Sequence, residues 1–239
     1  MHSSDARLTL PENEVHVWCA SLDLNAAVLG HLEPALTADE RSRAARYFFD
    51  RDRNRFIAAR AMLRDLLGKY MGLGADNLHL RYGTYGKPYC EPINGSPPIH
   101  FNVSHSAGTA VFAFSSGREV GVDVEAIRTD FAQDEVAEAH FSKRELAELR
   151  SLSPSLRAEG FFVCWTRKEA YLKALGWGLH APLTSFSVSL TPGQPEDLQS
   201  CDSHRWKMIS FRPASDHVGA VVAEGKNWHL RQWPWQFPA

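Results

Sequence analysis

Apolar residues recur along this chain at two spacings, either every second residue or every third to fourth residue. Alternation over 15–21 places Val15, Val17 and Cys19 on one face and predicts a strand. Spacing of three to four over 53–71 predicts a long amphipathic helix. Three further strands are expected in this half, over 78–82, 99–103 and 109–115.

Local signals mark where the helices of this half begin and end. Thr37 and Glu40 have the S/T-x-x-E spacing of a capping box, which predicts that a helix starts there. Gly72 and Gly74 follow the long helix. We expect them to end it, because glycine adopts the left-handed conformation of a helix C-cap without strain.

The second half of the chain repeats this order of elements. Another capping box, Ser142 and Glu145, again precedes a long helix. That helix is expected over 155–175, and Gly176 and Gly178 are expected to end it. The other expected elements are strands over 119–125, 185–190, 206–211 and 218–223, and helices over 134–140 and 142–152.

Both halves therefore have the order strand, helix, helix, strand, strand, strand, which indicates an internal duplication. We expect an α+β fold in which two similar α+β halves pack as an intramolecular pseudo-dimer. Residues 1–117 would form the first half and residues 118–239 the second, with a ligand cleft between them. The aromatic tail NWHLRQWPWQFPA is expected to lie against the body of the protein.

Composition points to an ordinary globular protein. Of the 239 residues, 44% are hydrophobic and 23% are charged. No stretch reaches the roughly 20 apolar residues of a membrane span, and the N-terminus lacks the apolar region of a secretory signal. The cysteines have no metal-site or disulfide spacing, so we expect a cytoplasmic protein in a reducing compartment. They are Cys19, Cys90, Cys164 and Cys201.

A net charge of −2 hides a strongly basic segment. Between Arg41 and Lys69, nine basic residues stand against three acidic ones. Such a segment is either the solvated face of a helix or a site for an anion, and charge alone leaves both open.

Two carboxylates share one face of the strand expected over 119–125. In the segment GVDVE, Asp123 and Glu125 alternate with valines, so they project to the same side about 7 Å apart. Two such carboxylates repel each other unless a cation lies near them. Magnesium bound by carboxylates and substrate phosphates fits this pattern, and a pair of exposed acids on an ordinary strand is the alternative.

A second group of polar residues lies on the long helix of the second half. Trp165, Glu169 and Lys173 follow each other at four-residue spacing and share one face. The two charges are either an ordinary surface ion pair or part of a cleft. The apolar residues around them indicate a mostly buried helix, which favours the cleft.

The strand over 99–103 is followed by a third group, Ser104, His105 and Ser106. Hydroxyls, an imidazole and backbone N–H groups at a strand end can together bind a phosphate. Upstream, Lys87 lies in a loop between Gly86 and Pro88. A plain turn is the alternative for either segment.

Four motifs together resemble the Sfp-type phosphopantetheinyl transferases, in the same order and at similar separations. They are GKP, FNVSHS, GVDVE and W-x-x-K-E-A-x-x-K, and the likeness extends from about Arg43 to Leu179. It implies a monomeric enzyme that moves 4′-phosphopantetheine from coenzyme A to a serine of an apo acyl or peptidyl carrier protein, releasing 3′,5′-ADP. Mg²⁺, or Mn²⁺ in its place, is implied as the metal. No nucleic acid and no membrane is implied as a partner.

The resemblance also implies site residues. Asp123, Glu125 and Glu169 match the carboxylates that bind the metal, and Glu169, Lys173 and Asp123 are the expected catalytic residues. Glu40 stands where some relatives carry a second cation. The residues expected to bind coenzyme A are Arg43, Arg55, Arg60, Lys87, Pro88, Asn102, Ser104, His105, Asp123, Lys168, Glu169 and Lys173.

The implied reaction leaves some roles open. Glu169 is the candidate base for the serine proton, directly or through a metal-bound water, and Asp123 or Glu125 could instead orient such a water. Two other functions fit the same residues: a metal-dependent phosphodiesterase, and a non-catalytic module that binds a nucleotide or a carrier.

Overall fold

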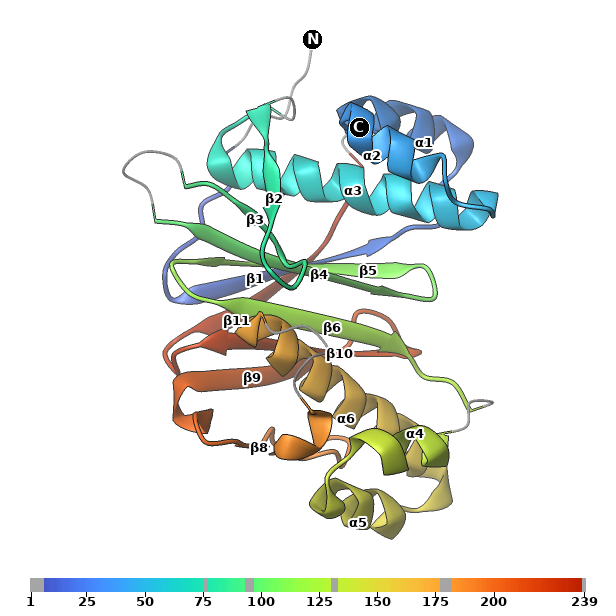
Figure 1. The fold of residues 1–239 in the computed structure, drawn as a ribbon, viewed down its shortest axis with the longest axis vertical. Helices are drawn as coiled ribbons and strands as arrows, with labels where there is room; N and C mark the ends of the chain where they lie inside the picture. The colour runs from blue at the N-terminus through green and yellow to red at the C-terminus, as the bar shows by residue number, and fades with distance from the viewer. Residues whose placement is uncertain (1–6, 75–76, 93–96, 130–132, 177–181, 238–239) are drawn as a thin grey trace.

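The computed structural model describes residues 7–74, 77–92, 97–129, 133–176 and 182–237. Two β-sheets lie face to face in the middle of the molecule, and helices cover the outer face of each (Figure 1). Within those residues, no helix combines the length and apolarity needed to span a bilayer.

The first half supplies three helices and five strands. α1 and α2 are short, whereas α3 runs along the whole outer face of the upper sheet (Figure 1). The elements are β1 (Glu14–Ser21), α1 (Ala26–Leu32), η1 (Glu33–Ala35), α2 (Ala38–Ala44), α3 (Asp50–Met71), β2 (Leu80–Tyr82), β3 (Pro88–Cys90), β4 (Ile99–Ser106) and β5 (Thr109–Ser116).

The second half has the same plan, with α6 as its long helix. Its elements are β6 (Val120–Ala126), α4 (Gln133–His140), α5 (Lys143–Ser151), α6 (Pro154–Leu175), η4 (Leu183–Ser185), β7 (Ser187–Val188), β8 (Leu198–Gln199), η5 (Ser203–Arg205), β9 (Trp206–Phe211), β10 (His217–Glu224) and β11 (His229–Pro234).

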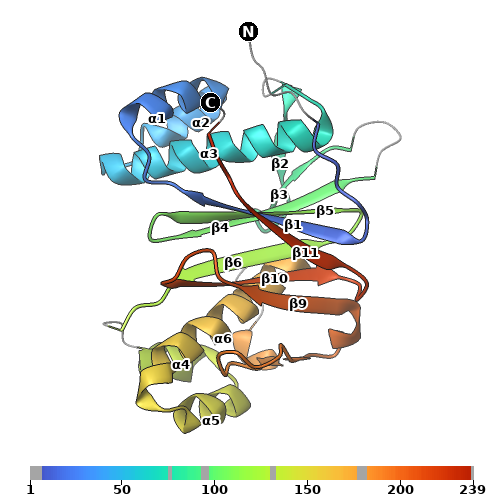
Figure 2. The ribbon, with the colours of Figure 1, turned by 180° about the vertical axis from the view of Figure 1, so that it is seen from behind.

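The strand order is equivalent in the two main sheets. One sheet has the order β11-β1-β5-β4 and the other β6-β10-β9, so the first strand of each half pairs with its last long strand. These pairs are antiparallel, whereas β11 pairs parallel with β1. The C-terminal strand therefore returns from the second half to the first sheet, as Figure 2 shows from behind.

The internal duplication expected from the sequence is confirmed in detail. α3 and α6 each contain 22 residues, and each ends at a glycine in the left-handed conformation, Gly72 or Gly176. Both expected capping boxes are present, at Thr37 before α2 and at Ser142 before α5. Gly178, also expected to end the second long helix, lies outside the described residues.

Each half also encloses one buried ion pair at the same place. The capping-box glutamate of α2, Glu40, accepts a hydrogen bond from Arg64 of α3 at 2.7 Å. Glu145 of α5 accepts two from Lys168 of α6, each at 2.7 Å. Arg64 and Lys168 occupy the same position counted from the start of their helices. The duplication thus includes the contact that ties each short helix to its long one.

Some expected elements differ from the structure. The strand expected over 185–190 is reduced to the two residues of β7, because a 3₁₀ turn occupies Leu183–Ser185. α1, β3, β8 and β11 were not expected as elements. The tail does lie against the body, as expected, and it does so as strand β11.

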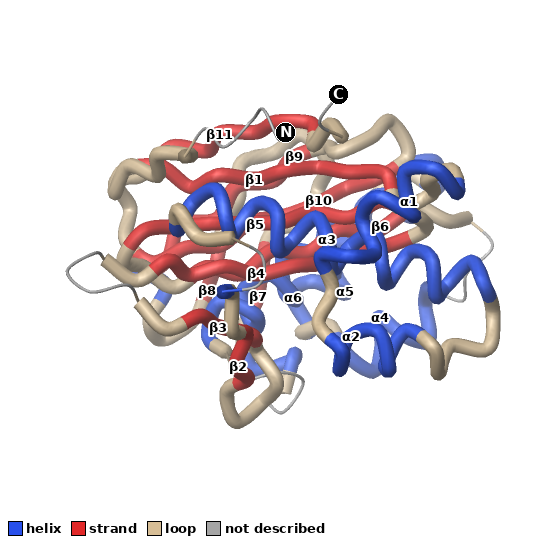
Figure 3. The backbone as a smooth tube through the Cα atoms, turned by 90° about the horizontal axis from the view of Figure 1, so that it is seen from above, coloured by secondary structure: helices blue, strands red, loops and turns tan. Residues whose placement is uncertain are grey.

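Four apolar clusters hold the described part of the molecule together, and one of them joins α1 and α2 to α3. Phe112 and Phe114 of β5 pack under α3, and Phe161 of α6 packs within the second half. Between the two sheets, valines of β1, β5, β6 and β10 form a third cluster with Trp228. Seen from above, α3 lies in front of the strands (Figure 3). The two halves therefore share a dry interface.

Gly121 allows α6 to approach β6 unusually closely. A Cβ atom at this residue would lie 2.2 Å from the carbonyl oxygen of Ala170 and 2.2 Å from the backbone nitrogen of Ala174. Real Cβ atoms do not approach backbone atoms so closely. The missing side chain therefore sets the height of α6 above β6.

We expect Gly121→Ala to destabilise the protein by about 1–3 kcal/mol, because the added methyl must push α6 away from the sheet. Denaturant unfolding measures this loss. Gly30→Ala in α1 is the control, since a Cβ there meets nothing within 4 Å. It should gain roughly 0.5–1 kcal/mol from helix propensity. Wild-type stability of Gly121→Ala would contradict the close approach.

Candidate active site

A cleft opens where the two sheets meet α6. Its volume is about 370 Å³, and it lies between an edge strand of each sheet and the long helix of the second half. The residues that line it are Val103, Ser104 and His105 of β4, Asp123 and Glu125 of β6, and Trp165, Glu169 and Lys173 of α6.

Side chains of β4 bind β6 across the junction of the two sheets. Asn102 accepts a hydrogen bond from the Val122 backbone nitrogen at 3.0 Å, through Oδ1. Ser104 donates to Asp123 Oδ1 at 2.6 Å. Because alternate residues of a strand share one face, Asn102 and Ser104 point the same way. The first half therefore orients the acidic strand of the second.

Ser106, the next residue on that face, binds Glu125. Its hydroxyl donates to Glu125 Oε2 at 2.6 Å and accepts from the Ala126 backbone nitrogen at 3.2 Å. The hydroxyl thus fixes both the carboxylate and the strand that carries it. From the sequence, Ser106 was expected in a candidate phosphate-binding group and not among the site residues. Its spacing of two residues from Ser104 places both hydroxyls on one face of β4, and this spacing could have predicted its position.

Lys173 approaches Asp123 from above the sheet. Its Nζ lies 2.6 Å from Asp123 Oδ1 and 3.1 Å from Ser104 Oγ. The contact depends on the height of α6, which Gly121 sets. Asp123, whose side chain is 5% exposed, thus has its charge balanced by an ammonium.

The other two carboxyl groups of the cleft are those of Glu125 and Glu169, and their ionised forms are disfavoured there. Burial, and then the charge of Asp123, raise the pKa of Glu169 above its ordinary value. Burial, opposed by the Ser106 hydrogen bond, also raises the pKa of Glu125. Asp123 Oδ2 and Glu169 Oε1 are buried and have no hydrogen-bond partner among the described residues. Such atoms carry a desolvation cost that a bound cation or donor would remove.

His105 lies on the same wall of the cleft. Burial lowers its pKa, and the nearby charges of Lys173 and Arg55 lower it further. The imidazole is therefore biased towards its neutral form in the free protein. An anion bound beside it would favour the protonated form instead.

The donor set fits a hard divalent cation, although it is not a closed metal site. Within the described ranges, no three His, Cys, Asp or Glu side chains converge as a ready-made site. Asp123, Glu125 and Glu169 nevertheless offer only oxygen atoms, which magnesium prefers, and two of these oxygens are buried without partners. Ligands from a substrate would have to complete the coordination.

Lys168 corrects one expectation. Its side chain is 0% exposed and bonds to Glu145 and to the Phe186 carbonyl oxygen at 2.9 Å. It therefore points away from the cleft, and the expectation that it binds coenzyme A is wrong. Asn102 is also absent from the cleft lining, because its amide oxygen is used by Val122.

The other expected basic residues lie outside the cleft lining. Arg55 forms a two-point contact with Asp23, at 2.7 and 2.8 Å. Arg60 lies 3.1 Å from Glu40 and contacts Tyr82.

Arg43 is exposed on α2, over the ring of Phe56.

The loop that carries Lys87 is anchored to the second half. Lys87 Nζ lies 2.7 Å from Glu119 and 3.4 Å from the Ala174 carbonyl oxygen. Hydrogen bonds from His100 and Lys87 lower the pKa of Glu119 to about 2. Pro88 begins β3 directly after this contact. The pair therefore brings the β2–β3 hairpin to the C-terminal end of α6.

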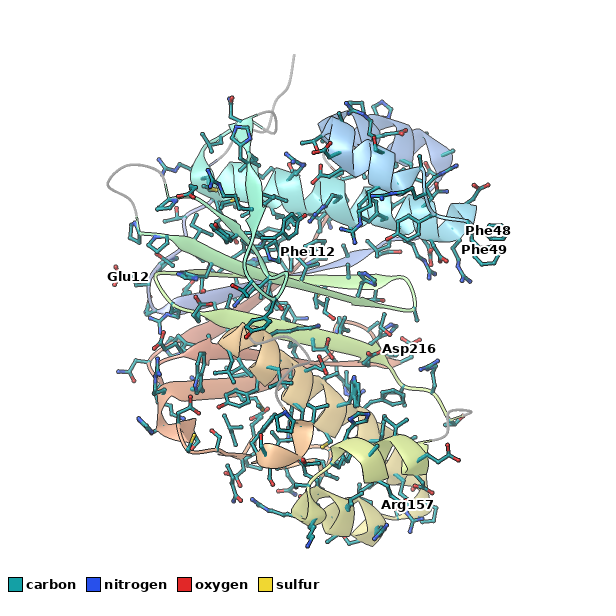
Figure 4. The ribbon with its side chains drawn as sticks, viewed as in Figure 1. Glu12, Phe48, Phe49, Phe112, Arg157 and Asp216 are labelled. Atoms are coloured by element: carbon teal, nitrogen blue, oxygen red, sulfur yellow. The ribbon has the colours of Figure 1, made fainter. Side chains whose placement is uncertain are left out.

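His217 is a supporting residue that the sequence analysis missed. It is 4% exposed, and its two ring nitrogens lie 2.7 Å from Asp216 Oδ1 and 3.2 Å from the Ser106 carbonyl oxygen. The imidazole therefore bridges the Asp216 side chain and the backbone of β4. Asp216 lies at the end of β6 in Figure 4. His217 thus contacts the backbone of Ser106, whose hydroxyl binds Glu125.

The chain is similar to proteins of known family over most of its length. Residues 119–222 match the family profile described as "4'-phosphopantetheinyl transferase superfamily", and residues 26–117 match "4'-phosphopantetheinyl transferase, N-terminal". Among similar proteins, 4'-phosphopantetheinyl transferase HetI of Nostoc sp. is 36% identical over 95% of this chain and 94% of its own length. 4'-phosphopantetheinyl transferase Sfp of Bacillus subtilis is 30% identical over 71% of this chain and 73% of its own length. The solved holo-[acyl-carrier-protein] synthase of Thermotoga maritima overlaps 45% of this chain and 63% of its own, at 22% identity and a TM-score of 0.37.

Replacing Lys168 by methionine should cost about 3–5 kcal/mol of stability, because Glu145 would keep a buried charge without its partner. Thermal or denaturant unfolding measures it. Lys69→Met is the matched control, since Lys69 forms a half-exposed i,i+4 pair with Asp65. It should cost less than about 1 kcal/mol. If Lys168→Met has normal stability but binds coenzyme A more weakly, Lys168 contacts coenzyme A and the correction above is wrong.

Glu169→Gln should stabilise the metal-free protein at pH values above 4.5, the ordinary pKa of glutamate. A raised carboxyl pKa means that the folded state holds the proton more tightly than the unfolded chain. The contribution of Glu169 to stability therefore falls as pH rises from its ordinary value of 4.5 through the raised pKa. The glutamine variant does not suffer this loss.

Thermal unfolding in a chelator, at several pH values, checks this expectation. The gain in stability should be small near pH 4.5 and grow as the pH rises above that value. A gain that does not depend on pH, or a loss at high pH, would show that the Glu169 carboxylate is not destabilised in the cleft.

Proposed function

The chain belongs to the 4′-phosphopantetheinyl transferase superfamily, and from this premise we propose which of its residues perform the reaction. The enzyme transfers a 4′-phosphopantetheinyl group to a carrier protein. The observation that supports our assignment is the cleft itself. Three carboxylates and one lysine of the second half line it, opposite Ser104 and His105 of the first half, and two carboxylate oxygens are buried without partners among the described residues.

The reaction is a phosphoryl-type transfer. The hydroxyl of a carrier serine attacks the β-phosphorus of coenzyme A, the P–O bond to the α-phosphate side breaks, and 3′,5′-ADP leaves. Such a step needs positioning and charge neutralisation more than covalent help from the protein. The cleft offers both, because its cationic and hydrogen-bonding groups are already fixed in place.

Lys173, Ser104 and His105 would bind the pyrophosphate. The Lys173 ammonium is the cationic group of the cleft lining, and Ser104 lies within hydrogen-bond distance of it. A phosphate that enters would compete with Asp123 for this lysine. His105, biased towards its neutral form in the free enzyme, would gain a proton and donate to the phosphate.

Asp123, Glu125 and Glu169 would hold the magnesium ion. Bound there with the pyrophosphate, magnesium supplies neutralisation of the charge that grows on the leaving group. Ser104 and Ser106 keep two of these carboxylates oriented, and Lys173 balances Asp123 when the site is free.

Glu169 would accept the proton of the attacking serine. Its Oε1 is buried without a partner, and its raised pKa makes the carboxylate a better base than an exposed glutamate. Asp123 is less suited to that role, since it already accepts hydrogen bonds from Ser104 and Lys173.

The basic residues around the cleft would hold the nucleotide. We assign the 3′-phosphate to Arg43, which is exposed on α2, with Arg60 and Arg55 on the adjacent helix. Lys87 and Pro88 would contact the nucleotide from the β2–β3 hairpin. Arg55, Arg60 and Lys87 each have an acidic neighbour in the free enzyme, so each would exchange or share it on binding.

We also propose that the enzyme acts as a cytoplasmic monomer made of an N-terminal half, 1–117, and a C-terminal half, 118–239. One chain supplies both walls of the cleft, β4 and β6, which supports the monomer. All four cysteines are free, which suits a reducing compartment.

Incubation with coenzyme A, magnesium and an apo carrier protein tests the function. Intact mass of the carrier should increase by one phosphopantetheine arm, and 3′,5′-ADP should appear in equal amount. Hydrolysis of coenzyme A without modification of the carrier would indicate a phosphodiesterase. Binding without either product would indicate a non-catalytic module.

Asp123→Asn should lower transfer roughly 100-fold or more, because the side chain keeps its shape but loses the charge that binds the metal. Folding should survive, since an amide oxygen can still accept from Ser104 and Lys173. High magnesium, or manganese, should restore part of the rate. Calorimetry should show that the affinity for Mn²⁺ falls in parallel.

Glu169→Gln provides the contrast. Added metal should restore its Mn²⁺ and coenzyme A binding without restoring turnover, because the base is missing. If Asp123→Asn transfers at a near-normal rate in low magnesium, the assignment of the metal to GVDVE is wrong.

A further inference from the structure

Of the two carboxylates on β6, Glu125 lies closer to the end of the strand. Asp123, two residues earlier, is held by Ser104 and Lys173, at 2.6 Å from each. Glu125 is the next-to-last residue of β6, and its Oε2 accepts a hydrogen bond from Ser106 at 2.6 Å. The orientation of this carboxylate therefore depends on how firmly Ser106 is placed.

Ser106 is itself the last residue of β4, beside a tight turn. Ala107 and Gly108 connect it to β5, and their φ angles are 47° and 89°. A left-handed φ is easy for glycine but strained for alanine, because the alanine Cβ crowds the backbone. Strained residues persist where the surrounding structure holds them in place. A contact from outside the hairpin therefore matters at the end of β4.

His217, the first residue of β10, supplies such a contact. Its side chain is 5% exposed, and its Nε2 lies 3.2 Å from the Ser106 carbonyl oxygen. The backbone of His217 pairs with Ala126, the last residue of β6. The ring thus connects β10 to β4 at the point where β6 ends.

The other ring nitrogen of His217 is held as well. Nδ1 lies 2.7 Å from Oδ1 of Asp216, which Figure 4 shows at the end of β6. The carbonyl oxygen of Asp216 accepts a hydrogen bond from the Ile127 backbone nitrogen at 2.8 Å. Contacts through both nitrogens restrict rotation of the imidazole, so its contact with Ser106 is fixed.

We propose that His217 is a positioning residue for the metal site. Its ring holds the end of β4, and Ser106, held in this way, keeps Glu125 in the orientation that binds a divalent cation. The proposal rests on the proposed function, in which Glu125 is one of the metal ligands. Groups that orient metal ligands without touching the metal change its affinity roughly 10- to 100-fold. His217 acts through Ser106, so we expect an effect of about 10-fold.

Packing alone is the alternative role for His217. A buried ring also fills space between strands, and a ring without nitrogens would fill it as well. The two roles therefore make different predictions for phenylalanine at this position.

Binding of Mn²⁺ tests the proposal directly. The ion is titrated into the whole protein with coenzyme A and without a carrier, and free Mn²⁺ is counted by electron paramagnetic resonance. His217→Phe keeps a ring but removes both nitrogens, so the affinity for Mn²⁺ should fall about 10-fold. In transfer assays, the magnesium concentration at half-maximal rate should rise about 10-fold, while kcat at saturating magnesium stays within about threefold.

Two amide variants separate the two ring contacts. In His217→Gln the amide reaches the place of Nε2 and can donate to the Ser106 carbonyl oxygen, so most of the affinity for Mn²⁺ should return. In His217→Asn the shorter amide reaches only the place of Nδ1, beside Asp216, and the loss should persist. These two variants also decide the question if His217→Phe does not fold.

Ser106→Ala shows whether His217 acts through this serine. The variant should itself bind Mn²⁺ more weakly, because Glu125 loses the hydroxyl that orients it. Adding His217→Phe to Ser106→Ala should cause little further loss, since both residues belong to one chain of contacts.

His16→Phe is the matched control. His16 is another buried histidine, and its ring nitrogens lie 2.7 Å from the Tyr70 hydroxyl and 2.9 Å from Glu14. It is not among the residues that line the cleft. Its replacement should lower stability without changing the affinity for Mn²⁺.

Three outcomes would overturn the proposal. Unchanged affinity for Mn²⁺ in His217→Phe would leave packing as the role of the ring. Equal affinities in His217→Gln and His217→Asn would show that the contact with the Ser106 carbonyl oxygen does not matter. Additive losses with Ser106→Ala would show that His217 acts by another route. Absence of metal-dependent transfer by the wild-type protein would instead refute the proposed function, so the two failures are distinguishable.

Discussion

The site depends on a row of hydrogen bonds from β4 to β6, where the two sheets meet without backbone pairing. Serine hydroxyls of one half orient the carboxylates of the other: Ser104 binds Asp123 and Ser106 binds Glu125, both at 2.6 Å. Hydrogen bonds to ionised groups are the stronger ones, so this row both joins the halves and aims the acids into the cleft. The layer of valines between the sheets fixes the distance that the hydrogen bonds from β4 to β6 must span. His217 then secures the row at the backbone of Ser106.

The second constraint is the height of α6. Since Gly121 has no side chain, the backbone of α6 lies directly on β6, and Lys173 and Glu169 reach the carboxylates below. The result is a cluster of three acids and one ammonium in a partly dry cleft, which burial makes unfavourable without a further cation. A cation and a phosphate that bind there would relieve this cost, so the free cleft is preorganised for such ligands. The stability of the free protein and its readiness for substrate are thus opposed through the same residues.

Much of this arrangement was predictable from local sequence. Periodicity and capping boxes located both long helices and most strands, since those signals depend on neighbours in the chain. The alternation of Asp123 and Glu125 and the helical spacing of Trp165, Glu169 and Lys173 also predicted which side chains face the cleft. What local sequence could not give is pairing between distant residues. Lys168 lies one residue from Glu169, yet it faces Glu145 in the core, and only the position of α5 decides this. β11 was missed for the same reason, because its partner, β1, lies more than two hundred residues earlier.

The duplication also explains why one chain has one such cleft. Trp18 of β1 pairs with Phe112 of β5, as Asp123 of β6 pairs with Ala220 of β10. By this register, the indole of Trp18 occupies the place of the Asp123 carboxylate. His16 precedes it where Gly121 precedes Asp123, and its ring meets the Tyr70 hydroxyl at 2.7 Å. Tyr70 holds the helical position that Ala174 holds in α6. Asp65 and Lys69 of α3 repeat Glu169 and Lys173, but they pair with each other, and Trp235 donates to Asp65 at 3.2 Å. Bulky side chains therefore prevent α3 from approaching β1 as closely as α6 approaches β6. The C-terminal segment covers the remaining acidic residue, Asp65. The fold is repeated, whereas its chemistry resides in the half where glycine and alanine let helix and strand touch.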